Sequence, residues 1–171
     1  DPGFVSNTDY HILGTFPNGV GQNGLSAIDI DGDTRPAAGS TTVDIGADEF
    51  TPLNWDASLE ALLVPLGGCG SATTMVQAVI KNFGMNTITS LPLTVNYSGG
   101  LTGTMNVTAS VNIPQGATDT VTIGTFNSFA GATGVNFMGY ASLVGDQKNS
   151  NDTLAKGPAN YIPVEPDTHG M

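Results

Sequence analysis

From residue 57 onward, apolar and polar residues alternate in segments separated by turn-forming sequences. Alternation buries one face of a segment and leaves the other in water, which predicts half-buried β-strands. Glycine-containing stretches such as 98–100 and 114–116 supply the turns. About seven strands at this spacing predict an immunoglobulin-like β-sandwich over residues 57–160. The expected strands span 57–65, 73–82, 88–97, 104–111, 118–126 and 135–143, with a weaker one near Tyr161.

Residues 1–50 follow a different pattern, in which short apolar runs lie between Gly, Asn and Pro without a helical period. This pattern predicts turn-rich β structure, so the whole chain is expected to be all-β. Pro52 and the sole tryptophan, Trp55, mark a short packed junction over 51–56. The last residues, from about Pro158 and assigned to 161–171, are expected to form an extended acidic tail. The apolar runs are 4–5, 10–13, 25–30 and 43–45.

Charged residues are sparse, with 4 basic and 15 acidic side chains and a net charge of −11. So little basic surface argues against nucleic acid and against anionic membrane surfaces as partners. No stretch approaches the ~20 apolar residues of a membrane span. Cys69 is the only cysteine, which excludes an intramolecular disulfide. The Gly- and Thr-rich neutral composition is typical of extracellular all-β proteins, so we expect a secreted or cell-surface location.

The acidic residues concentrate in one short segment. Residues Asp29, Asp31 and Asp33 have the spacing that lets a strand face, or a loop containing glycine, bring their carboxylates together. Calcium takes about six to eight oxygen ligands and tolerates loop geometry, so the segment is a candidate calcium site. It is not an EF-hand, because Ser40 stands where that loop needs a bidentate glutamate. The candidate ligands are Asp29, Asp31, Asp33, Asp44, Asp48 and Glu49.

A structural interpretation competes with calcium. Arg35, within the same segment, can bind one of the aspartates as an internal ion pair, while others accept backbone N–H groups in Asx turns. We prefer this interpretation to calcium, and calcium to catalysis. A glycosidase needs a pair of carboxylates on either side of a sugar, which these terminal segments are not expected to supply. The two histidines, His11 and His169, lie far apart in sequence and give no support for a hydrolase triad. We therefore expect no catalytic residues and no cofactor other than calcium.

The segments 1–4, 8–13, 26–30 and 43–50 together resemble the closing coils of a right-handed parallel β-helix in choice-of-anchor type bacterial surface proteins. Such coils expose unpaired strand edges, and stacking on neighbouring copies of the chain would build a filament. The chain begins with Asp1 and shows no signal peptide, so we expect a mature or partial chain of a longer precursor.

The sandwich carries a second resemblance. Residues 76–90, with an Asn-x-Gly turn, then Pro114-Gln-Gly, then 145–153 with an Asn-Asp turn, resemble a CARDB-type immunoglobulin-like module. Such modules accompany β-helix ends in substrates of the type IX secretion system of gliding bacteria. The resemblance implies a structural or adhesive role without shared catalytic residues.

The function expected from the sequence is a non-enzymatic structural or adhesive module of a secreted bacterial surface protein. The alternative is the C-terminal fragment of a carbohydrate-active β-helix enzyme, with the sandwich as spacer or glycan-binding module. Trp55 and Tyr97 are the aromatic residues that could stack on a surface glycan. Thr120 and Thr153 lie in Asp-Thr-apolar sequences that resemble bacterial O-glycosylation sites.

Overall fold

The computed structural model describes residues 19–38, 40–46, 48–49 and 51–164. The chain divides into two compact units, Asp1–Leu53 and Asn54–Met171, which are described separately below. In the part of the chain that the structure describes, no helix is long and apolar enough to cross a membrane.

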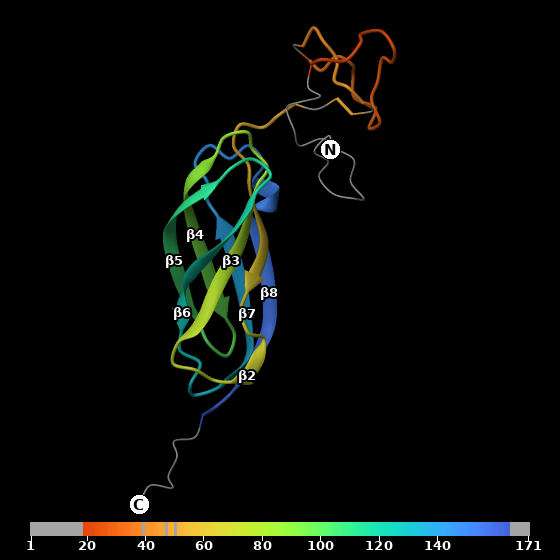
Figure 1. Cartoon of the computed structure of the whole chain (residues 1–171). Helices are drawn as coiled ribbons and strands as arrows, with labels where there is room; N and C mark the ends of the chain where they lie inside the picture. The colour runs from red at the N-terminus through yellow and green to blue at the C-terminus, as the bar shows by residue number, and fades with distance from the viewer. Residues whose placement is uncertain (1–18, 39, 47, 50, 165–171) are drawn as a thin grey trace, which may run out of the picture. The chain divides into compact units, whose positions relative to one another are not determined.

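The larger unit is a β-sandwich of two sheets (Figure 1). One sheet has three antiparallel strands in the order β1-β3-β6, and the other has five in the order β2-β8-β7-β4-β5. The strands are β1 (Ala57–Leu63), β2 (Gly67–Cys69), β3 (Thr74–Asn82), β4 (Ile88–Ser98), β5 (Gly103–Ile113), β6 (Thr118–Phe126), β7 (Ala132–Ala141) and β8 (Thr153–Ile162). A single 3-10 turn, η1 (Asn149–Asn151), precedes β8.

The strand order is that of an immunoglobulin-like sandwich. Strands β3 and β4 follow one another in sequence but lie in opposite sheets, as do β6 and β7. These crossovers place the inward faces of both sheets against one another. The sandwich and its all-β class are thus as the alternating sequence predicts.

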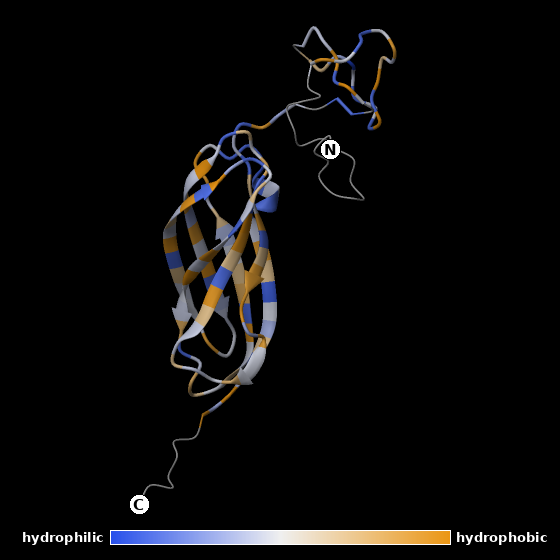
Figure 2. Ribbon diagram, in the orientation of Figure 1, coloured by the Kyte–Doolittle hydropathy of each residue, from blue (hydrophilic) through white to orange (hydrophobic). Residues whose placement is uncertain are grey.

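The core lies between the sheets and is formed by the apolar positions of the alternating pattern (Figure 2). On β4, Leu91, Leu93 and Val95 are buried, while the residues between them face outward. An aromatic cluster fills one part of the core, with ring centroids 5.3 to 6.1 Å apart in pairs among Tyr97, Phe126, Phe137 and Tyr161. Aromatic and aliphatic side chains therefore fill the core, and the single cysteine, Cys69, is exposed outside it.

Two features of this unit differ from the sequence-based expectation. Strand β2 is a short glycine-rich segment that pairs parallel to β8, and its sequence carries no alternation to reveal it. The expected tail also begins too early, because residues up to Ile162 belong to β8. Tyr161 is buried and its hydroxyl donates a hydrogen bond to the Pro65 carbonyl at 2.6 Å, which holds this part of the chain in the sandwich.

The smaller unit is built of turns. Its described residues contain no strand, only an isolated antiparallel bridge between Ile28 and Thr34. The β-helix coils therefore stay a prediction, and the runs expected at 25–30 and 43–45 are loops and turns. The runs at 4–5 and 10–13, together with His11 and His169, lie outside the described residues.

Candidate functional site

Asp29 organises the first acidic turn of the smaller unit. Its Oδ1 accepts hydrogen bonds from the N–H groups of Asp31 at 2.9 Å and Asp33 at 2.8 Å, and its Oδ2 accepts one from the N–H of Glu49 at 3.1 Å. Burial acts to raise the pKa of Asp29, but these amides and that of Gly32 outweigh it and hold the pKa below its usual range. The first Asp of the segment is thus an ionised Asx-turn residue.

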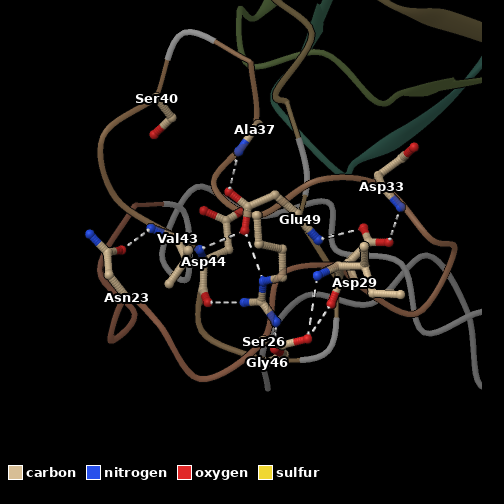
Figure 3. Close-up of polar contacts among 12 residues, drawn as sticks. Asn23, Ser26, Asp29, Asp33, Ala37, Ser40, Val43, Asp44, Gly46 and Glu49 are labelled. Atoms are coloured by element: carbon tan, nitrogen blue, oxygen red, sulfur yellow. Dashed lines mark hydrogen bonds and ion pairs between the residues drawn. The ribbon is translucent and has the colours of Figure 1, made fainter.

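Arg35 forms the central contact of the segment, and its partners Asp44, Gly46 and Glu49 are labelled in Figure 3. Its Nε donates to Oε2 of Glu49 at 3.1 Å, and its terminal nitrogens donate to the carbonyls of Gly46 at 2.8 Å and Asp44 at 2.6 Å. The side chain is 11% exposed and that of Glu49 only 2%. The predicted internal ion pair is therefore formed with Glu49, whereas the sequence suggested an aspartate. The glutamate side chain is longer than that of an aspartate, so Glu49 reaches the planar guanidinium of Arg35 from across the loop.

Glu49 is a fully engaged carboxylate. Besides Arg35, it accepts hydrogen bonds from the N–H groups of Ala37 at 2.9 Å and Asp44 at 3.2 Å. Burial acts to raise the pKa of Glu49, but the two amides and the Arg35 charge together lower it. One charged side chain therefore ties together three stretches of loop. Asp44 accepts a further hydrogen bond at Oδ1 from the N–H of Gly19.

Three of the six candidate calcium ligands come together. Oxygens of Asp29, Asp31 and Asp48 all lie within 4.8 Å of one another, and Asp48 is buried. Glu49 and Asp44 are not in this group. The Glu49 carboxylate and the Asp44 carbonyl both accept hydrogen bonds from Arg35. Asp33 is also outside the group, and its carboxylate points away in Figure 3. Three converging carboxylates can hold a hard cation, so calcium at Asp29, Asp31 and Asp48 remains a hypothesis.

Asp29 and Glu49 lack the raised pKa of a catalytic acid. A glycosidase needs one carboxyl group with a raised pKa to protonate the leaving group. The pKa values of Asp29 and Glu49 are both shifted downward. Their chemistry is that of anions that accept hydrogen bonds and close turns.

The remaining candidate residues lie in the sandwich unit. Tyr97 packs its ring against Phe126 and Phe137 in the core, so the core rather than a sugar is the partner of its ring. Trp55 is half-buried, before β1. Thr120 on β6 and Thr153 at the start of β8 are both exposed, as a modification site requires.

One surface was not evident from the sequence. On the outer face of the five-stranded sheet, Thr94 donates to Oδ1 of Asn106 and Thr104 donates to Oδ1 of Asn96, each at 2.8 Å across β4 and β5. Beside these pairs, a shallow groove of about 260 Å³ is lined by both polar and apolar residues, among them Phe137, Ala155 and Gly157. The lining includes Asn96, Ser98, Asn136, Met138 and Lys156. The alternating polar residues of 94–98 indicate a polar outer face. The sequence did not show which residues of β5 and β7 lie beside them, because that depends on strand register.

No protein-family model matches the chain, and no curated protein matches it. The assignment of a role therefore depends on the residues themselves.

Proposed function

We propose that this chain is a non-enzymatic structural or adhesive module of a secreted bacterial cell-surface protein. The observation that carries the proposal is the outer face of the five-stranded sheet, where the amides of Asn96 and Asn136 and the hydroxyl of Ser98 lie at a groove that also contains apolar groups, and where Thr–Asn pairs join β4 to β5. Such groups both donate and accept hydrogen bonds, as recognition of a neutral glycan requires. The carboxylates of the smaller unit, by contrast, are used in turn closure.

The CARDB-type resemblance supports the same role. Its three motifs fall at the end of β3 (Asn82 to Gly84), in the β5–β6 turn (Pro114 to Gly116) and just before β8 (Asn151-Asp152). In the β5–β6 turn, the N–H of Ala117 donates to the Pro114 carbonyl at 3.0 Å. Secretion by the type IX route is part of the proposal and follows from this resemblance alone.

Exposed apolar residues support neighbouring copies of the chain as partners. Among the described residues of the smaller unit, five aliphatic side chains are 50–78% exposed. We take these exposed side chains as part of the surface that a neighbouring copy covers. The five are Val20, Leu25, Ile28, Ile30 and Ile45. We propose that stacking through this unit builds an extracellular filament, and light scattering that shows only monomers at high concentration would reject that part.

A glycan array probed with the whole chain tests the adhesive role. We expect binding of a neutral glycan, reduced at least tenfold by the double substitution Asn96→Ala and Asn136→Ala. The matched control is Gln77→Ala with Thr122→Ala, which removes a comparable exposed polar pair from the other sheet, where Gln77 donates to Thr122 at 3.2 Å. Failure to bind any glycan, or equal loss in both double variants, would reject glycan adhesion.

The alternative function is a fragment of a carbohydrate-active β-helix enzyme in which the sandwich binds glycan. The same groove supports the sugar-binding part of this alternative. Incubation with a panel of polysaccharides distinguishes the two. Release of reducing ends by the wild-type chain would replace our proposal with the alternative.

A further inference from the structure

A second acidic cluster lies at one end of the sandwich, outside the segment discussed above. Asp56 immediately precedes β1, and Asp152 immediately precedes β8. They are 2% and 7% exposed, respectively. The loop between β7 and β8 carries Asp146. This residue lies close enough to Asp56 and Asp152 for its negative charge to act on each of them.

The cluster is held by a dense set of backbone contacts. The N–H of Gln147 donates to the Trp55 carbonyl at 2.9 Å, and Gln147 Oε1 accepts from the N–H of Asn54 at 2.6 Å. Asp146 accepts hydrogen bonds from the N–H groups of Ala57 and Lys148, each at 2.8 Å. The loop and the segment before β1 are therefore fixed against each other, and the cluster is preformed.

Two oxygens in this cluster are buried without a hydrogen-bond partner among the described residues: Oδ1 of Asn151 and Oδ1 of Asp152. A buried acceptor without a partner is costly, and native structures contain few of them. The Asn151 amide cannot be turned to remove the problem, because its Nδ2 already donates to Oδ1 of Asp56 at 2.8 Å. Both oxygens are acceptors, so their missing partner is a proton donor or a cation.

The charges favour a cation. Asp56 and Asp152 are both buried carboxylates, and Asp146 adds a third negative charge that acts on each of them. The two unpartnered oxygens therefore lie among concentrated negative charge, which a bound positive ion would balance.

We propose that Asp152, Asn151 and Asp56 form a binding site for a divalent cation of the calcium class. The two unpartnered oxygens and the Asp56 carboxylate supply hard oxygen ligands, which suit calcium rather than zinc. Asp146 positions the loop and adds negative charge. Since the ligands join β1 to the β7–β8 loop, the ion would fasten this end of the sandwich. Affinity of roughly 10⁻⁴–10⁻³ M is typical of extracellular modules.

Trp55 provides a local probe. It is the only tryptophan, it adjoins Asp56, and its Cδ1 would lie 3.6 Å from a β-carbon placed on Gly145 of the same loop. Terbium is a luminescent substitute for calcium, and selective tryptophan excitation reports an ion bound near this side chain. We expect tryptophan-sensitised terbium luminescence from the whole chain that calcium displaces. We also expect calcium at ten times its dissociation constant to raise the melting temperature by roughly 4–8 °C.

Two matched variants locate the ion. Asp152→Asn should reduce the terbium luminescence at least tenfold and the calcium-dependent rise in melting temperature at least fivefold. The calcium-free variant should melt no lower than wild type, because the substitution removes repulsion between carboxylates. Asp31→Asn, in the group of Asp29, Asp31 and Asp48, should leave both signals unchanged. The proposal is overturned if neither signal appears at millimolar metal, if Asp31→Asn removes them, or if Asp152→Asn retains them.

Discussion

Asn82 offers the sharpest test of how the sandwich is held together. Its side chain is fully buried and makes its hydrogen bonds to backbone groups. Nδ2 donates to the carbonyls of Asn86 and Ile113, each at 2.8 Å, and Oδ1 accepts from the N–H of Gly84 at 2.9 Å. This one amide therefore joins the β3–β4 turn to the end of β5, across the two sheets.

We expect Asn82→Ala to destabilise the sandwich unit by about 3 kcal/mol, because three hydrogen bonds worth ~1 kcal/mol each are lost together. For a domain of this size, the melting temperature should fall by roughly 10–15 °C. Asn82→Asp should cost more at neutral pH, since a carboxylate cannot donate to the carbonyls of Asn86 and Ile113. The cost should become smaller in acid, where the introduced carboxyl group is protonated and regains one donor.

Urea denaturation followed by Trp55 fluorescence measures these free energies of unfolding. Asn106→Ala is the matched control, because Asn106 is exposed and accepts a single side-chain hydrogen bond, from Thr94. The control should change the free energy of unfolding by no more than about 0.5 kcal/mol. Equal values for Asn82→Ala and Asn106→Ala would refute the reasoning, as would a more stable Asn82→Asp.

Three further predictions concern other contacts. Glu49→Gln should weaken hydrogen-exchange protection of the Ala37 amide at least tenfold, because it breaks a buried ion pair, and unchanged protection would contradict this. In calcium-free buffer, the free energy of unfolding should fall by about 2–3 kcal/mol as the pH rises from 4 to 6. The reason is that Asp152 has a pKa of about 6 in the folded protein and about 3.8 in the unfolded chain, so the folded state holds its proton to a higher pH. Asp152→Asn should flatten this pH profile. Gly84→Ala should cost about 1–3 kcal/mol in thermal or urea unfolding, since its β-carbon would lie 2.7 Å from the Asp56 nitrogen; wild-type stability would show that this backbone can move.

The sandwich was predictable because its signal is local. Each strand that alternates along its length, such as β4 or β6, is evident from the spacing of its apolar residues. Strand β2 was not, because Gly67 and Gly68 have no side chains to alternate, and its pairing with β8 depends on residues far away in sequence. The end of β8 was predicted only as a weaker strand near Tyr161, because Pro158 suggested a tail; the burial of Tyr161 keeps the chain in the sheet.

The candidate sites divide in the same way. The sequence located the acidic segment and the ion pair of Arg35, since both follow from rare charged residues close together. It did not show that Glu49 is the partner or that Asp29, Asp31 and Asp48 form a separate group, because loop geometry sets those distances. Asp56 and Asp152 were not recognised as a pair, since 95 residues separate Asp56 from its hydrogen-bonded partner Asn151.

The sequence by itself determined the all-β class, the place of most strands and the position of the acidic segment. These follow from alternation and composition, which act over a few residues. Only the tertiary structure decided which polar groups meet, from the Thr94–Asn106 pair on the outer sheet to the unpartnered oxygens of Asn151 and Asp152. Strand register and loop conformation determine these contacts between polar groups, and both depend on the packing of the whole sandwich.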